Sequence, residues 1–343
     1  MIRSGVVAAR SSFISAVRLF QADPDIRLAN SEIYLDPAEP RKVGIITHGH
    51  SDHIGRHEHF IATVPTAAFL RARSGDDLKG TELAYRTRHD VGGWTVELYP
   101  AGHVLGSAMV RVSNGEHALA YTGDFRLTPS YTAERAEIPE AGAVIMESTY
   151  GGDERWQFPS REELRERLVA LVTSIIRKEK TPVLLAYSLG KAQETAFMLR
   201  DSGVRVVMHP VVARISSIYE RNGIDLGTYE VWGRQESLFG HRSTTDLRGK
   251  ALIVPPHMTS EIRRVPHRET VALTGWALHG TRDADHGLPL SDHADFRELI
   301  AFAEESRAGV IYVTHGSKRF AEELRRRGIR AEFLRKKPQM RLF

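Results

Sequence analysis

Three histidines and an aspartate fall within six consecutive positions near residue 50 of this sequence. They belong to the stretch Thr-His-Gly-His-Ser-Asp-His-Ile-Gly at residues 47–55, which directly follows an apolar run. Side chains two positions apart in an extended chain share a face, so His48 and His50 are expected to point the same way. The small residues around them allow a tight turn that directs Asp52 and His53 toward a neighbouring point. We therefore predict two adjacent metal positions here, rather than a polar surface loop.

Further candidate ligands follow predicted strands elsewhere in the chain. His103, Asp124 and His315 each come directly after such a strand, so all three should reach the sheet edge that carries the first motif. His103 completes a three-nitrogen site with His48 and His50, and Asp124 can bridge both metals through its two oxygens. The predicted metal ligands are His48, His50, Asp52, His53, His103, Asp124 and His315.

Nitrogen and oxygen donors of this kind suit zinc or manganese. Two such ions about 3.5–4 Å apart activate water and stabilise the charge of a phosphoryl transition state. The chain has no cysteine, so disulfides, thiolate zinc sites and cysteine nucleophiles are excluded, while its 16 histidines can supply the nitrogens. The sequence thus favours hydrolysis that depends on two divalent metal ions.

The length of 343 residues suggests about two domains. In the first part a hairpin over 26–36 leads into predicted strands at 43–47, 60–64, 95–99, 108–112, 118–122 and 143–146. From about Trp156 the pattern changes to alternating helices and strands, which is typical of a small parallel sheet. The elements of this second part are helices over 159–178, 190–200 and 211–222 and strands over 182–187, 204–208 and 271–276. A helix to about residue 306, a strand over 310–314 and a final helix complete the chain.

A net charge of +4 and a pI near 9.3 make the chain mildly basic. The excess gathers near the C-terminus, at Lys318, Arg319, Arg325, Arg326, Arg327, Arg330, Arg335, Lys336, Lys337 and Arg341. A polyanionic partner and a solvated helix face both account for such a cluster, and the sequence leaves the two open. No apolar run approaches the ~18 residues that a membrane span needs. We expect no membrane association and a cytoplasmic location.

The N-terminal residues 1–22 contain Arg3, Arg10 and Arg18 and no acidic residue. Organelle transit peptides share this composition, but the apolar region and cleavage pattern of a secretory signal are missing. We interpret residues 1–22 as a poorly ordered extension.

The ordered ligand motifs resemble those of the metallo-β-lactamase superfamily: His-x-His-x-Asp-His at 48–53, His103 in Ala-Gly-His-Val-Leu-Gly-Ser-Ala and Asp124 in Thr-Gly-Asp-Phe. Three further motifs resemble those of its β-CASP branch, whose known members process nucleic acids. They are Glu147 in Glu-Ser-Thr-Tyr-Gly, His293 in Ser-Asp-His-Ala-Asp-Phe and His315 in Thr-His-Gly-Ser. Within that branch, Ala-Tyr-Ser-Leu-Gly-Lys-Ala-Gln at 186–193 and the compact insertion resemble the bacterial ligase-associated DNA exonuclease group, also labelled mRNA 3′-end processing factor-like.

This resemblance implies an α/β fold: a four-layer αββα core with the metals at the sheet edge, and an inserted small parallel-sheet β-CASP cap. It divides the chain into an extension at 1–22, core at 23–155, cap at 156–282 and core again at 283–343. It also implies that Asp52, Glu147 and His293 take part in catalysis. A carboxylate that is hydrogen-bonded to an imidazole favours the protonated ring, so Glu147 would make His293 a general acid.

The function implied is a two-metal phosphodiesterase that hydrolyses nucleic acid, most specifically a DNA exonuclease in DNA repair or processing. A functional link to an ATP-dependent DNA ligase and a helicase follows from the same group. A β-CASP ribonuclease is the competing expectation, because a histidine at the last motif, here His315, is associated with RNA-processing members. A small-molecule hydrolase, such as a thioesterase or lactonase, and a binding module with an inactive site are further alternatives.

The segment 186–193 predicts a strand, a glycine and a helix start, where backbone N–H groups can bind a phosphate. Ser188, Gly190 and Lys191 are therefore candidate contacts to a substrate phosphate, although a plain helix cap explains the same pattern. The remaining histidines that we considered are expected to be surface or packing residues, and two of them, His209 and His279, could line the groove. This set is His57, His59, His209, His279 and His286.

Overall fold

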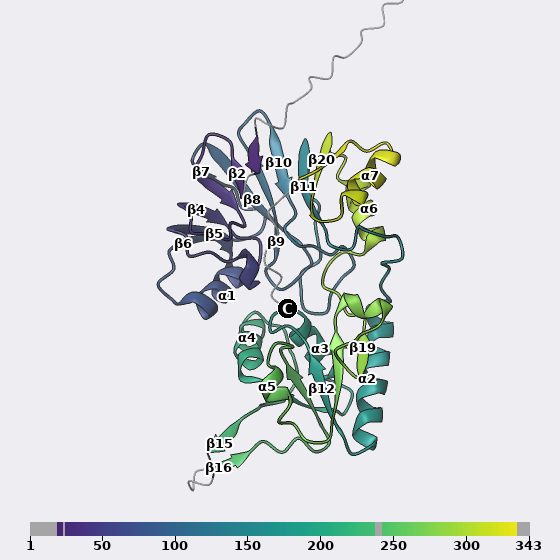
Figure 1. Cartoon of the computed structure of the whole chain (residues 1–343). Helices are drawn as coiled ribbons and strands as arrows, with labels where there is room; N and C mark the ends of the chain where they lie inside the picture. Colours follow the sequence, from purple (N-terminus) through teal and green to yellow (C-terminus); the bar gives the residue numbers. More distant parts are fainter. Residues whose placement is uncertain (1–18, 23–24, 237–241, 335–343) are drawn as a thin grey trace, which may run out of the picture.

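The computed structural model describes residues 19–22, 25–236 and 242–334, without the side chains of Asp52 and of residues 234–244. Most of the predicted extension at 1–22, and the basic residues from Arg335 onward, lie outside the described part. The chain forms two lobes stacked end to end (Figure 1). One contains two sheets and both ends of the described chain, and the other contains the middle of the sequence.

The first sheet of the upper lobe has six strands in the order β1-β2-β3-β4-β5-β6. They are β1 (Phe20–Ala22), β2 (Ile26–Leu28), β3 (Ile33–Leu35), β4 (Val43–Ile45), β5 (His59–Thr63) and β6 (Gly80–Leu83). β1, β2 and β3 are antiparallel neighbours, as expected for the hairpin, whereas β3 to β6 run parallel.

The second sheet has seven strands in the order β21-β20-β11-β10-β9-β8-β7. They are β7 (His89–Val91), β8 (Trp94–Pro100), β9 (Ala108–Ser113), β10 (Ala118–Tyr121), β11 (Ala143–Ser148), β20 (Val310–Gly316) and β21 (Ala331–Phe333). β20, from the end of the chain, pairs in parallel with β11 and so returns the C-terminal segment to the lobe that the N-terminal half begins.

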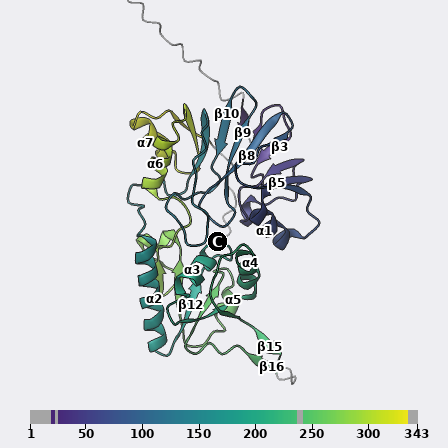
Figure 2. The same cartoon turned by 180° about the vertical axis from the view of Figure 1, so that it is seen from behind.

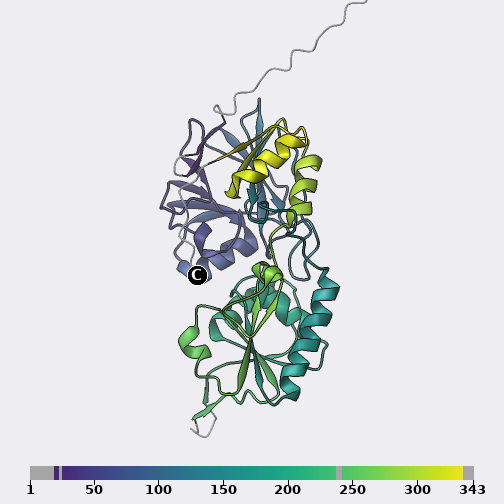
Figure 3. The ribbon, with the colours of Figure 1, turned by 45° about the vertical axis from the view of Figure 1, so that its right-hand side comes forward.

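Three apolar clusters build the upper lobe into four layers. Leu28 and Ile45 of the first sheet pack with Val96 and Tyr121 of the second, so the sheets face each other. Helix α1 (Val64–Ser74) packs on the outer side of the first sheet. Helices α6 (Phe296–Glu305) and α7 (Lys318–Arg326) pack on the outer side of the second, as Figure 3 shows. The expected αββα core is confirmed.

The lower lobe contains a six-stranded sheet in the order β14-β13-β17-β12-β18-β19, in which all neighbours are parallel. Its strands are β12 (Thr181–Leu185), β13 (Arg205–Met208), β14 (Tyr229–Val231), β17 (Lys250–Val254), β18 (Arg268–Leu273) and β19 (His286–Leu288). Helices α2 (Arg161–Arg177), α3 (Lys191–Leu199) and α4 (Pro210–Arg221) cover one face, and α5 (Thr259–Ile262) covers the other. Figure 2 shows this lobe from behind, with the hairpin of β15 (Arg234–Glu236) and β16 (Arg242–Thr244) at its far end.

The sequence patterns missed several elements of this architecture, and two of them, α1 and β17, have a clear physical reason. Helix α1 begins just after a predicted strand, and its Thr63 cap and Pro65 were not recognised as a helix start. Strand β17 lies between β13 and β12, and all five of its residues are buried, so it shows no alternation of polar and apolar side chains. The predicted small parallel sheet is nevertheless confirmed.

The two lobes share an apolar contact. Phe69 of α1 lies 5.7 Å from Tyr219 of α4, measured between ring centroids, and Val104 and Leu105 of the upper lobe belong to the apolar cluster of the lower one. Packing of this kind fixes the lower lobe against helix α1 and the loop that follows β8. No helix in the described part of the chain is long and apolar enough to cross a membrane.

Candidate metal centre

The predicted ligands converge where loops leave the two facing sheets. His48 follows β4, and His53 ends a short 3₁₀ helix, Ser51–His53. His103 follows β8, and Asp124 follows β10. The side chain of Asp52 lies outside the described residues, although its backbone belongs to the same 3₁₀ helix.

The donor atoms of these residues lie at metal-ligand spacing. Oδ2 of Asp124 is 3.6 Å from Nε2 of His48, 3.6 Å from Nε2 of His53 and 3.9 Å from Nε2 of His103. Nδ1 of His50 is 3.1 Å from Nε2 of His103. Ligand atoms of a tetrahedral zinc ion with bonds near 2.0–2.1 Å are about 3.3 Å apart. The structure therefore brings together His48, His50, His103 and Asp124 as one potential metal-binding group.

Hydrogen bonds decide which imidazole nitrogen faces the centre. The rings of His103 and His50 donate to backbone oxygens, from Nδ1 to Asp292 at 2.9 Å and from Nε2 to Leu189 at 3.2 Å. The other nitrogen of each neutral ring is then an acceptor, and these two lone pairs face each other across 3.1 Å. Nε2 of His48 is buried and has no hydrogen-bond partner among the described residues. Unprotonated nitrogens that meet in this way fit a bound cation.

Asp36 is a functional candidate that the sequence did not reveal. Its Oδ2 accepts hydrogen bonds from Nδ1 of His53 (2.9 Å) and from Oγ1 of Thr47 (2.6 Å), and Thr47 Oγ1 in turn accepts from Nδ1 of His48 (2.9 Å). One buried carboxylate thus orients two predicted ligands. A carboxylate behind metal-bound imidazoles is common, but nothing in the local sequence around Asp36 signals it.

Burial controls the protonation of the central rings. It lowers the pKa of His48 and of His103 well below the usual range of an imidazole. Both rings are therefore neutral at pH 7 and can offer a lone pair. Their electrostatic environment agrees with the hydrogen-bond pattern.

His315 lies near His53. It stands at the end of β20, and the centroid of its ring is 6.2 Å from that of His53. Its backbone has a φ of 48°, in the left-handed region, which is uncommon for a residue other than glycine and often marks a functional site. The placement is compatible with the role of last ligand that the sequence predicts.

Glu147 and His293 meet beside these donors, although they come from distant strand and loop segments. Nδ1 of His293 lies 2.9 Å from Oε1 and 3.1 Å from Oε2 of Glu147, and its Nε2 lies 3.9 Å from Oδ2 of Asp124. Burial would lower the pKa of His293, but the carboxylates of Glu147 and Asp124 outweigh it and raise the pKa to about 10. The ring is thus protonated on both nitrogens, and its Nε2–H group lies beside Asp124.

Comparison with known proteins shows which proteins this chain resembles. Residues 286–335 match the Zn-dependent metallo-hydrolase RNA specificity domain. The chain is 34% identical over 309 residues to a probable DNA ligase of Opitutus terrae, covering 87% of this chain and 29% of that protein. It is 31% identical over 215 residues to the transcription termination factor FttA of Thermococcus kodakarensis, covering 52% of this chain and 32% of that protein.

A third relative is RNase aCSPSF2 of Saccharolobus solfataricus, 27% identical over 188 residues, which cover 46% of this chain and 38% of that protein. The chain thus spans about a third of the length of these curated relatives. A solved structure of a protein of unknown function from Enterococcus faecalis V583 has the same fold. It matches with a TM-score of 0.60 at 16% identity, over 87% of this chain and 80% of that one.

The family model and these relatives support the β-CASP branch of the metallo-β-lactamase superfamily as the family of this chain. The family model and the donor set together indicate a site for divalent metal.

The lower lobe, which corresponds to the β-CASP cap, also holds the loop that carries His293. Lys191 of α3 is buried and forms an ion pair with the Oδ1 atom of Asp292. Arg161 of α2 donates to the carbonyl oxygen of Ser291 at 2.7 Å. The buried Arg126 of the core donates to the same oxygen. Two cationic side chains of the cap therefore fix the two residues that precede His293.

Contact of Ser188, Gly190 and Lys191 with a substrate phosphate stays a prediction. The backbone N–H of Gly190 donates to Oε1 of Gln193 at 2.9 Å, which is a helix-capping contact. Oγ of Ser188 lies 3.4 Å from Nη2 of Arg73. In the structure, the Lys191 ammonium has Asp292 as its partner.

The other histidines have structural partners. His57 is buried and its Nδ1 accepts from the Arg41 backbone N–H at 3.1 Å. The remaining contacts are His59 with Thr81 at 2.9 Å, His209 with Glu261 at 3.0 Å, His286 with Glu269 at 2.8 Å, and the ring of His279 with that of Trp156 at 4.4 Å. These partners agree with surface or packing roles.

The described part of the basic C-terminal cluster is largely paired. Glu323 contacts Arg326 at 2.7 Å and Arg327 at 2.8 Å, and Arg325 donates to the backbone oxygen of Ala331 at 2.8 Å. Surface ion pairs of this kind contribute little to stability and reduce the free charge that a polyanion would meet.

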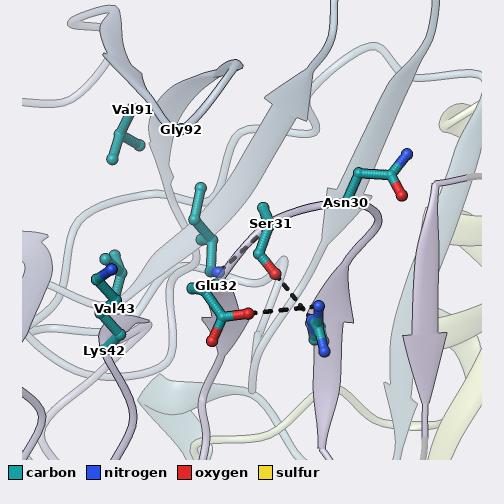
Figure 4. Close-up of a pocket in the computed structure, with 9 residues that line it drawn as sticks. Asn30, Ser31, Glu32, Lys42, Val43, Val91 and Gly92 are labelled. Atoms are coloured by element: carbon teal, nitrogen blue, oxygen red, sulfur yellow. Dashed lines mark hydrogen bonds and ion pairs between the residues drawn. The ribbon is translucent and has the colours of Figure 1, made fainter.

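A surface pocket lies at a different edge of the core (Figure 4). It is lined by the β2–β3 turn, the start of β4 and the β7–β8 turn, whereas the metal donors follow the strand ends. Arg27 crosses it to contact the Ser31 backbone oxygen at 2.8 Å and the Glu32 carboxylate at 3.4 Å. The pocket contains no histidine, and it is separate from the metal centre.

Proposed function

We propose that this chain is a two-metal phosphodiesterase that hydrolyses nucleic acid, with DNA exonuclease as the specific activity. The observation that supports this most is the Glu147–His293 pair, whose outward Nε2 lies 3.9 Å from a predicted bridging ligand, Asp124. A proton donor fixed beside a metal site suits the departure of an alkoxide from a phosphodiester. We further propose a cap that begins at about 156 and a core made of residues 23–155 and the C-terminal segment. Because β19 (His286–Leu288) pairs with β18 in the sheet of the cap, the cap continues through β19 and past the boundary at 282 that the sequence predicted.

In the proposed mechanism His48, His50 and His103 would hold one ion and Asp52, His53 and His315 would hold the other, with Asp124 as a further ligand. Zinc or manganese, when bound there, would supply an activated water and charge stabilisation for in-line displacement at phosphorus. Glu147 accepts a hydrogen bond from the Nδ1–H group of His293, which fixes the ring and stabilises its cationic form. His293 then delivers its Nε2 proton to the leaving 3′ or 5′ oxygen.

The presence of the cap favours a polymeric substrate over a small ester as the substrate of this site. It contributes Lys191 and Arg161 to the loop of the general acid and the Leu189 carbonyl to His50. A thioesterase or lactonase needs neither a proton donor for an alkoxide nor a domain of this size above the site. Turnover of a thioester with no turnover of any nucleic acid would contradict the nuclease proposal.

The preference for DNA is supported by the relative that is named a probable DNA ligase and that matches over most of this chain. RNA is the second candidate, because other relatives are named RNase and transcription termination factor and the matched family is described as an RNA specificity domain. Action in DNA repair, in a cytoplasmic location and beside an ATP-dependent DNA ligase and a helicase, is the cellular role that we propose.

The decisive experiment digests single-stranded DNA and RNA of the same sequence side by side, each labelled at one end, with Mn²⁺ or Zn²⁺ supplied. Stepwise loss of nucleotides from DNA, with RNA cut at least ten-fold more slowly, is expected. Faster cutting of RNA would assign the chain to the ribonucleases of the branch. The position of the label that is released first also reports polarity.

A further inference from the structure

Two aromatic side chains near the candidate metal centre are unusually exposed. Trp276 is 49% and Tyr187 is 44% exposed, and they are the only aromatic residues among the large exposed apolar side chains of the described residues. Both belong to the cap. Single exposed apolar side chains are normal on a protein surface, so the distinguishing feature of these two rings is their place beside the candidate catalytic residues.

The indole of Trp276 is held firmly despite its exposure. Its ring centroid lies 5.0 Å from that of Tyr150 and 5.0 Å from that of Trp156, and the backbone belongs to the 3₁₀ helix Gly275–His279. Gly275 permits this packing, since a Cβ atom there would lie only 2.3 Å from Oη of Tyr150. One face of a fixed ring is thus packed while a large part stays accessible.

Tyr150 connects this ring to the catalytic pair. It stands three residues after Glu147, and its ring centroid is 6.2 Å from that of His293. A single aromatic side chain, that of Tyr150, therefore lies between Trp276 and the proposed proton donor His293. The neighbourhood of a charged hydrolytic site favours a substrate group over a protein partner as the occupant of the exposed ring.

Tyr187 borders the same loop from another cap element. Its ring lies 5.4 Å from Nζ of Lys191, whose ammonium pairs with Asp292 next to His293. Exposed rings from two cap elements thus flank the residues 291–293.

We propose that Trp276 is a stacking platform for a nucleobase next to the scissile phosphate, with Tyr187 as a second aromatic contact to the strand. Every base presents a flat π face, so a rigid aromatic ring binds single strands with little sequence preference. The same subsite serves DNA and RNA. This inference rests on the proposed nuclease function, because it identifies the part of the substrate that the cap recognises.

The test uses dT oligonucleotides that carry 2-aminopurine near the cleaved end, mixed with the full chain by stopped flow on a time scale shorter than cleavage. Stacking on Trp276 should quench 2-aminopurine fluorescence. Trp276→Ala should abolish the quench and weaken binding roughly 5- to 100-fold. Trp276→Phe should keep most of both, and Val231→Ala, which alters an exposed apolar side chain elsewhere on the cap, should match wild type.

A second comparison needs no variant. Wild type should bind an oligonucleotide with abasic residues near the cleaved end as weakly as Trp276→Ala binds the normal strand. Equal binding of normal and abasic strands by wild type, or an unchanged quench in Trp276→Ala, would overturn the platform while leaving the nuclease proposal intact. A wild-type protein that neither binds nor cuts any oligonucleotide would overturn the proposed function itself.

Discussion

Nδ1 of His50 lies 3.1 Å from Nε2 of His103, and in each ring the opposite nitrogen is committed to a backbone carbonyl oxygen. Two lone pairs that face each other repel unless a cation lies between or beside them. The hydrogen-bond pattern therefore indicates a metal centre, as the residue types do.

His103→Ala should remove one of the two metal ions that we propose. The remaining donors around His53 and Asp124 can still hold the second, so metal analysis should fall from about two ions per chain to about one. His59→Ala, which alters a half-buried histidine that contacts Thr81, is the matched control and should keep both ions. An unchanged metal content in His103→Ala would contradict the proposed ligand set.

Glu147→Gln should slow the chemical step while leaving substrate affinity nearly unchanged. The amide cannot stabilise the cationic ring of His293, and loss of general acid catalysis typically lowers kcat about 10²- to 10⁴-fold. A general acid must be protonated, so activity is lost as pH rises through its pKa. The pKa of His293 is raised to about 10 in the wild type.

The alkaline limb of the pH–kcat profile should consequently move to lower pH in Glu147→Gln, in the direction of an ordinary imidazole. Measurement of kcat and KM between pH 5 and 10 checks this expectation. A profile with the same alkaline limb in both proteins would mean that His293 is not the proton donor.

Lys191→Met should impair catalysis through the position of the His293 loop. The buried ion pair with Asp292 is lost, and removal of one partner from such a pair typically costs about 3–5 kcal/mol. We expect kcat to fall while metal content is retained, because Lys191 contacts no predicted ligand side chain. Lys79→Met, at an exposed position, serves as the control. A change confined to KM would instead favour a direct phosphate contact by Lys191.

Gly44→Ala should destabilise the strand that leads to the histidine loop. A Cβ atom at residue 44 would lie 2.4 Å from Cδ2 of the buried His57 ring, and overpacking of this kind typically costs about 1–3 kcal/mol. The control is Gly142→Ala, where the nearest atom is 3.8 Å away. Thermal unfolding should separate the two variants, and equal melting temperatures would show that His57 moves aside freely.

Much of the site could be predicted because its chemistry is local in sequence. The cluster at 47–55 and the strand-end positions of His103 and Asp124 are visible in residue types and spacing alone. The resemblance to the β-CASP branch extended this prediction to Glu147 and His293, which the structure brings to 2.9 Å.

The supporting contacts could not be predicted in the same way. Asp36 stands alone at the end of β3, and its link to His53 and Thr47 exists only after the parallel pairing of β3 with β4. Lys191 was predicted from a local strand–glycine–helix pattern, whereas its partner Asp292 is 101 residues away. Strand β17 was missed because both of its faces are buried. These features depend on tertiary contacts that no short stretch contains.

The most direct test of the account is digestion of end-labelled single-stranded DNA and RNA by wild type and by Asp124→Ala, with Mn²⁺ present. Asp124 lies within 3.9 Å of imidazole nitrogens of four histidines, and all proposed chemistry depends on it. We predict stepwise degradation of DNA by wild type and a rate at least ~10³-fold lower for the variant. Degradation by Asp124→Ala at the wild-type rate would contradict the metal-dependent mechanism.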